Sequence, residues 1–230
     1  MKMLLATSFF IIIGQNCFAQ NNYPTSDSIH IFWQPGLIIT FADYKGPLTQ
    51  EMEGFMKIYD VSVSASVGIW SILDIPKKKK DRYRKFEKVY FAPAFERTTS
   101  YAKSNDSLQI AMQNIYLDIC ELCARGARRE LISIQDSMKS TGALSIFYST
   151  AKQDMEKMKL EMYRGYFKDV FIDKKEGAFA WWRKLIDRWL EESKDYATTK
   201  EECYRLLSGK PIEEGYIQAP TVMGPLFDNR

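Results

Sequence analysis

The chain has 230 residues, of which 46% are hydrophobic, 14% aromatic and 27% charged. Its formal net charge at pH 7 is +3, a mild balance that argues against nucleic-acid binding and against strong attraction to a membrane. Beyond the N-terminal region, no apolar run is long enough to span a bilayer. We therefore expect no nucleic-acid partner and no membrane-spanning segment.

Residues 1–19 have the features of a secretory signal peptide. A short positive start precedes an apolar run from Met3 to Gly14, and the segment ends in a small-residue cleavage site at Ala19. The apolar run is too short for a membrane helix. Asn16 argues against lipid attachment at Cys17, because that processing needs a small residue there. Cleavage after Ala19 predicts a secreted or periplasmic chain.

The first part of the remaining chain is expected to form strands. Residues 61–69 alternate strictly between apolar and small residues, which indicates a strand with one buried face. Residues 29–33 and 37–41 are two further apolar runs, separated by the turn signal Gln34-Pro35-Gly36. Residues 88–91 begin another strand, which Ala92-Pro93 is expected to close.

Helical periods dominate from residue 107 onward. The spacing predicts helices over residues 107–136, 150–171 and 179–196, with Gly177 between the last two. Strands followed by helices, without alternation, predict an α+β fold: a small mixed or antiparallel sheet, then a helical half with a central buried helix. We expect one domain over residues 20–207 and a Gly- and Pro-containing coil tail over residues 208–230.

Three cysteines remain after cleavage of the signal peptide: Cys120, Cys123 and Cys203. Redox CxxC motifs lie at helix N-termini, where the thiolate is stabilised, whereas Cys120 and Cys123 fall inside a predicted helix. The spacing therefore favours two buried helical cysteines. A disulfide between either of these cysteines and Cys203 is the alternative if the compartment is oxidising.

Residues 77–85 carry seven positive charges and one negative charge, with Tyr83 among them. This basic run is compatible with binding to an anionic surface or polymer. A solvated loop between two strands explains it equally well.

A helical wheel divides the segment Met112–Arg125 into two faces. One face carries Met112, Tyr116, Ile119, Cys120 and Cys123, which is typical of a core face. The other carries Asn114, Asp118, Glu121 and Arg125. Glu121 and Arg125 are an i,i+4 pair, and this face either anchors the helix to neighbouring loops or faces water.

Several separated segments resemble one bacterial family. Residues 39–47 (ITFADYKGP) are similar to an "L-x-W-x-D-F-x-G" opening, and residues 89–95 with Ser100-Tyr101 resemble "v-x-a-x-F" and "S-W" elements. Asp118, Glu121 and Arg125 match a signature "H-E-Q-x-H-F-D-I-x-E-x-x-A-R". These motifs are those of the domain of unknown function 922 family, which looks like a branch of the secreted zincin metallopeptidases.

The sequence differs from this family pattern at the residues that would bind the metal. Met112 and Tyr116 stand where two histidine ligands belong, and Gln113 stands where the glutamate base belongs. Residues 171–177 resemble the element with the third ligand, which places Glu176 there. Two histidines one helical turn apart bind zinc in such enzymes, so the resemblance implies a zincin-like scaffold without its metal, cofactor or catalysis.

The sequence thus favours a secreted or periplasmic pseudoenzyme, a non-catalytic binding or structural protein of the cell envelope. An unknown protein or peptide is the expected partner, with residues 61–69 as a candidate edge for strand addition. The alternative is an active hydrolase that uses the non-standard carboxylates Asp118, Glu121 and Glu176.

Overall fold

The computed structural model describes residues 23–220, so the predicted signal peptide and the last ten residues lie outside the described part. A four-stranded antiparallel sheet has the order β1-β4-β3-β6, and a separate two-stranded sheet joins β2 to β5. The strands are β1 His30–Phe32, β2 Val63–Ser64, β3 Val67–Pro76, β4 Lys88–Glu96, β5 Tyr101–Ala102 and β6 Tyr216–Gln218. All the described strand pairs are antiparallel.

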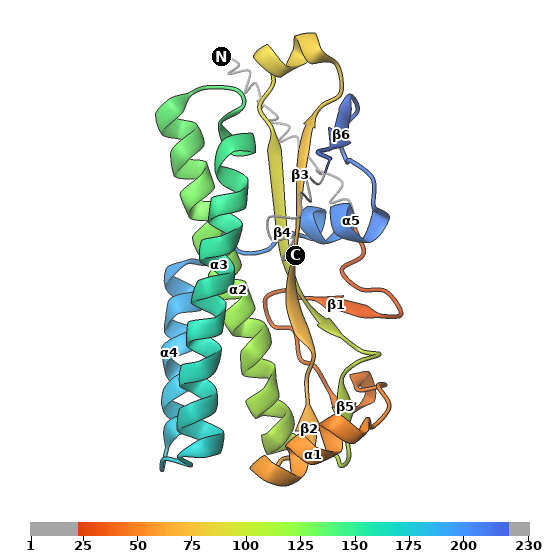
Figure 1. Cartoon of the computed structure of the whole chain (residues 1–230), viewed down its shortest axis with the longest axis vertical. Helices are drawn as coiled ribbons and strands as arrows, with labels where there is room; N and C mark the ends of the chain where they lie inside the picture. Colours follow the sequence, from red (N-terminus) through yellow and green to blue (C-terminus); the bar gives the residue numbers. More distant parts are fainter. Residues whose placement is uncertain (1–22, 221–230) are drawn as a thin grey trace, which may run out of the picture.

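Two long helices dominate the second half of the chain (Figure 1). The α-helices are α1 Gln50–Tyr59, α2 Ser107–Met138, α3 Ala143–Phe167, α4 Ala178–Glu192 and α5 Lys200–Ser208. Short turns at η1 Phe41–Asp43, η2 Lys79–Tyr83 and η4 Lys194–Tyr196 are 3-10 helices, and η3 Lys168–Ile172 is a π-helical turn. The predicted α+β class, with antiparallel sheets followed by a helical half, is confirmed.

The large sheet separates two layers of side chains. Neighbouring residues of β4 contribute to different layers, because successive side chains of a strand point to opposite faces. Phe91 packs into the main core with Ile115 and Ile119 of α2, whereas Ala92 packs with Cys203 of α5. Helices α2, α3 and α4 therefore stand on one side of the sheet and α5 lies on the other (Figure 1).

Helix α2 is the central buried helix that the sequence predicts. Asp106 caps its start by accepting hydrogen bonds from the backbone N–H groups of Leu108 and Gln109. Side chains on several sides of the helix are buried, including Ile115, Ile119 and Glu121. Within residues 23–220, no helix is both long and apolar enough to cross a bilayer.

The sequence predicts one continuous strand over residues 61–69, and this prediction is wrong. Strand β2 ends at Ser64, and β3 begins only at Val67. Between them, Ala65 N donates to Gln113 Oε1 at 3.2 Å and Ser66 N donates to Ser100 Oγ at 2.8 Å. These side chains take the backbone groups that a continuous ladder would have used.

Strand β4 runs through Pro93, where the sequence predicts its end. Pro93 lacks an N–H, which normally confines proline to strand edges. Its carbonyl accepts from Trp33 N at 2.8 Å, just past the end of β1. The backbone nitrogen and oxygen of one strand residue point to the same side, so the missing donor falls where β1 has already ended.

Other boundaries also differ from the prediction. Residues 37–41 form no strand; the capped turn η1 begins at Phe41 instead. The helix expected over residues 150–171 begins at Ala143, and the helix expected to reach Tyr196 ends at Glu192. Helices α1 and α5 were not predicted. The tail is not all coil, because β6 pairs with the end of β3 and Ile217 lies opposite Ile75.

Candidate functional site

Two of the four residues that the resemblance assigns to a metal site, Gln113 and Tyr116, border a groove near the start of α2. The groove has a volume of about 290 Å³. The link from Ser64 to Val67 forms one wall, and Phe55 of α1, Tyr163 and Phe167 of α3 and Phe171 of η3 add aromatic surface. Gln113 and Tyr116 of α2 also line the groove, together with Val61.

Gln113 is buried, with 7% of its surface exposed. Its side-chain oxygen accepts a hydrogen bond from the backbone N–H of Ala65, which ties α2 to the β2–β3 link. An amide can hydrogen-bond but cannot accept a proton at neutral pH. Gln113 therefore positions the strand link and does not act as a general base.

Tyr116 stands among other tyrosines. Its ring makes edge-to-face contacts with Tyr163 and Tyr166, with centroids 4.8 and 5.1 Å apart. Tyr163 donates to the Tyr116 carbonyl at 3.1 Å, and Tyr166 donates to the Met112 carbonyl at 2.8 Å. Burial raises the pKa of the Tyr116 phenol, so the phenol stays neutral at physiological pH and is a poor metal ligand.

The other two predicted positions do not line this groove. Met112 packs, partly buried, against the main core. Glu176 is exposed in the turn between η3 and α4. Across residues 23–220, no three His, Cys, Asp or Glu side chains gather in a group that could hold a metal ion.

Asp118 anchors the N-terminal segment and α4 to the central helix. One carboxylate oxygen accepts from Trp33 Nε1 at 2.7 Å, and the other accepts from Arg183 Nη1 at 2.6 Å. The Trp33 ring also lies 4.9 Å from the Arg125 guanidinium, a cation–π contact. The polar face of α2 therefore anchors neighbouring segments, the first of the two alternatives that the sequence left open.

Glu121 is fully buried, and both of its oxygens are occupied. Oε1 accepts from Arg125 Nε at 2.7 Å and from Thr198 N at 2.9 Å, and Oε2 accepts from Thr198 Oγ1 at 2.5 Å. Arg125 in turn donates to the Leu190 carbonyl at 2.5 Å. Burial raises the pKa of Glu121, while Arg128, Thr198 and Arg125 oppose that shift.

Arg128 belongs to the same network, although the sequence argument missed it. Its Nε donates to Glu202 Oε1 at 2.8 Å, and its terminal nitrogens donate to the carbonyls of Tyr196 and Phe91 at 2.5 and 2.6 Å. The sequence does contain a signal for this network. A 3-4-3 spacing keeps four charged residues on one helical face: Asp118, Glu121, Arg125 and Arg128.

The three cysteines are free thiols, and all are buried. Cys120 and Cys123 lie on α2, and the Cys120 Sγ is 2.8 Å from the Tyr163 hydroxyl. Cys203 packs on the opposite face of the sheet, so the sheet separates it from both helical thiols. The prediction of two buried helical cysteines is confirmed. The alternative, a disulfide to Cys203, is not formed.

Comparison of the chain with protein-family models, with curated proteins and with solved structures gives no match.

Proposed function

We propose that this protein is a secreted or periplasmic, non-catalytic binding protein with a zincin-like scaffold whose metal ligands are lost. The observation that supports the proposal is the groove lined by Gln113 and Tyr116. The resemblance assigns these positions to a base and a metal ligand, and here they are an amide and a neutral phenol. The proposed ligand is an extended peptide of a cell-envelope protein.

A partly unpaired strand edge beside this groove supports a peptide ligand. Strand β6 pairs with β3 only from Asp74 to Pro76, so among the described strands β3 has one partner, β4, from Val67 to Leu73. The Leu73 carbonyl points to the β6 side, because it accepts from Ala219 N at 2.8 Å. By the strand alternation, the backbone groups of Val67, Ile69 and Ser71 point to that same free side. An added peptide strand would satisfy them.

The aromatic wall supports a preference for apolar side chains. Phe55, Tyr116, Tyr163 and Phe167 line the groove, and the Phe55 and Phe167 rings lie 5.8 Å apart. A pocket of this kind takes one apolar residue of a bound strand, while backbone hydrogen bonds hold the residues on either side.

The test is selection from a displayed decapeptide library, followed by backbone N-methylation of each selected peptide. We expect methylation at alternate peptide residues to abolish binding and methylation at the intervening residues to leave it, because a strand bonds its neighbour at every second residue. Uniform tolerance of methylation would contradict strand addition.

Metal analysis tests the absence of catalysis. We expect no stoichiometric zinc in the purified protein and no peptidase activity. Zinc at one equivalent, together with peptidase activity that Glu176→Gln abolishes, would overturn the proposal.

The alternative hydrolase has less support from the geometry. Asp118 and Glu121 each place both carboxylate oxygens in hydrogen bonds with protein groups, and Glu176 is exposed in a turn. Turnover that persists with chelator present and is lost on Asp118→Asn would favour this alternative.

A further inference from the structure

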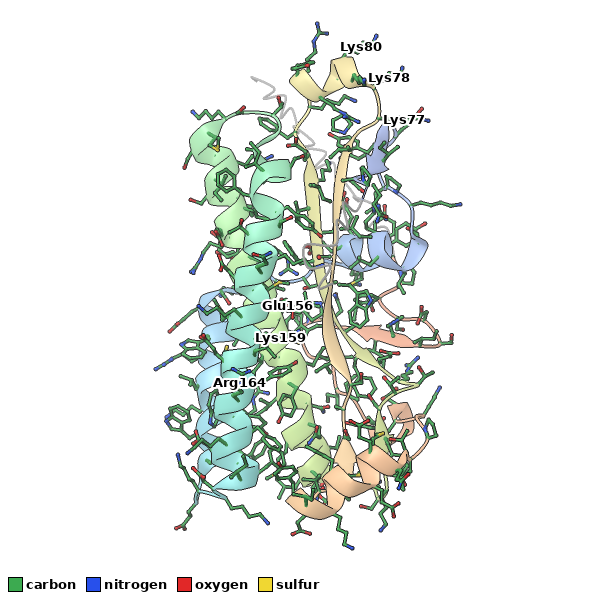
Figure 2. All side chains as sticks on the ribbon, in the orientation of Figure 1. Lys77, Lys78, Lys80, Glu156, Lys159 and Arg164 are labelled. Atoms are coloured by element: carbon green, nitrogen blue, oxygen red, sulfur yellow. The ribbon has the colours of Figure 1, made fainter. Side chains whose placement is uncertain are left out.

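The turn between β3 and β4, residues 77–86, carries the strongest concentration of charge on the molecule; we call it the basic tip. Its cations are Lys77, Lys78, Lys79, Lys80, Arg82, Arg84 and Lys85. The 3-10 helix η2 shapes it, and Asp81 N donates to the Lys78 carbonyl at 2.9 Å. Figure 2 shows Lys77, Lys78 and Lys80 at one end of the long axis of the molecule.

The charge of the basic tip exceeds that of the whole chain. Seven cations and Asp81 give residues 77–86 a formal charge of +6. Because the entire chain carries +3, all the other residues together carry −3. An anionic surface orients an elongated molecule whose positive charge lies at one end, even when the net charge of the molecule is small.

The cations of the basic tip have few partners among the described residues. Every residue of the tip except Asp81 is exposed, and the described ion pairs include none of its cations. Arg82 Nε donates to the Pro76 carbonyl at 3.1 Å, and Lys85 Nζ lies 5.9 Å from the centre of the Tyr216 ring. Neighbouring Glu213 is paired with Lys88. The positive charge therefore faces solvent.

Two exposed aromatic rings accompany these cations. Tyr83 has 84% of its surface exposed and Phe86 has 43%. The Phe86 carbonyl accepts from the Tyr216 hydroxyl at 2.9 Å, which fixes the base of the tip against β6. Lysines interleaved with exposed aromatic side chains are suited to a lipid headgroup region, where the cations meet phosphates and the rings enter the interface.

We propose that the basic tip docks end-on onto an anionic phospholipid surface. The convex shape of a single turn favours a flat surface over a long polyanion. A nucleic acid needs a groove or stripe of cations along which its backbone can run, and beyond the tip the chain is net negative. Docking is independent of the peptide groove, because α1 and β2 beside that groove lie at the opposite end of the molecule (Figure 1).

The test is co-sedimentation of the purified protein, its N-terminus determined by mass spectrometry, with lipid vesicles. The vesicles contain phosphatidylcholine with or without about one third phosphatidylglycerol, in about 0.1 M salt. We expect binding only to the anionic vesicles, with loss at high salt. The triple variant Lys78→Gln, Lys79→Gln, Lys80→Gln should bind about 100-fold more weakly, since each lysine near an anionic surface contributes about 1 kcal/mol.

A matched variant separates local charge from net charge. Lys152→Gln, Lys157→Gln, Lys184→Gln removes three exposed lysines from α3 and α4 and should keep the original affinity. Tyr83→Ser should weaken vesicle binding several-fold. Equal binding to neutral vesicles, equal losses in both triple variants, or tighter binding to duplex DNA or polyphosphate than to vesicles would each overturn the proposal.

Discussion

Glu121 is the residue at which the central helix holds the C-terminal part of the chain. Its two oxygens accept three hydrogen bonds from Arg125 and Thr198, and Arg128 Nη1 lies 3.8 Å away. Thr198 directly precedes the Thr199 cap of α5. Asp118, Glu121 and Arg125, the residues that resemble a metallopeptidase signature, therefore each hold a neighbouring segment of this fold.

We predict that Glu121→Gln destabilises the fold by about 3–5 kcal/mol, because it leaves buried arginine charge without its carboxylate. Urea unfolding followed by circular dichroism measures the change. Glu191→Gln is the matched control, since its partner Lys194 is exposed and such surface pairs contribute little. Equal stability of the Glu121→Gln variant and the parent protein would contradict the structural role of the network.

Gln113 and Tyr116 line the groove together, and the sequence places them one helical turn apart, but it does not show which segment packs against them. The wheel left Gln113 off the core face, yet its side chain is buried because the β2–β3 link brings Ala65 N against it. That link depends on pairing between segments far apart in the chain. Periodicity within one helix carries no information about it.

At the scale of elements, β3 has one partner that follows it directly in the chain, β4, and one from near the C-terminus, β6. It pairs with β4 along eight residues and with β6 along three. The hairpin with β4 is a local connection between consecutive strands. The β6 pairing joins residue 75 to residue 217, which no local signal predicts, so the sequence assigned that segment to coil.

We predict that Ile217→Pro detaches β6. The hydrogen bonds Ala219 N to Leu73 O and Lys77 N to Gly215 O make Ile217 and Ile75 a hydrogen-bonded pair, so proline removes a ladder donor. The expected loss is about 1–3 kcal/mol, with faster exchange of the amide hydrogen of Ala219.

Gln218→Pro is the control for this prediction. In an antiparallel ladder the next residue points its N–H away from the partner strand, so proline there should leave the β3–β6 bonds and the Ala219 exchange rate nearly unchanged. Equal effects of the two substitutions would mean that β6 does not pair in this register.

At the scale of the whole molecule, α2 connects both layers. Its apolar residues pack against the sheet and α3, while Arg128 reaches Glu202 of α5 on the far side of the sheet. Because the same helix contributes to both layers, we expect the two layers to unfold together.

The three thiols test this cooperativity. Burial raises the pKa of Cys120, Cys123 and Cys203 to about 12, whereas an unfolded thiol ionises near pH ~8.5. We predict negligible alkylation of the folded chain at pH ~8.5 and a single urea midpoint for labelling at all three sites, measured by peptide mass spectrometry. Labelling of Cys203 at lower urea than Cys120 would show that the α5 layer opens separately.

The same thiols predict the direction of a pH effect. The unfolded chain loses its thiol protons at lower pH than the folded chain does, so it binds fewer protons between the two pKa values. Stability must therefore fall as pH rises from ~8.5 toward 12. Replacing Cys123 with alanine should reduce this alkaline slope in chemical unfolding measured at several pH values.

The mild net charge in the sequence led us to expect no strong membrane attraction, and that expectation rests on the sum over the chain. The sequence concentrates a charge of +6 in residues 77–86, leaving −3 on the rest, and the fold places that run on one protruding turn. Electrostatic attraction to a surface depends on this local arrangement within a Debye length, which composition cannot give.

The sequence by itself determined the α+β class, the central helix, the burial of Cys120 and Cys123, and the residues of the basic run. These follow from periodicities of 2 and 3.6 and from local charge, which neighbouring residues specify. Only the tertiary structure decided that Asp118, Glu121 and Arg125 anchor distant segments, that β6 completes the sheet, and that Gln113 and Tyr116 share a groove. Those facts depend on contacts between residues tens of positions apart, and such contacts form only when the whole chain packs.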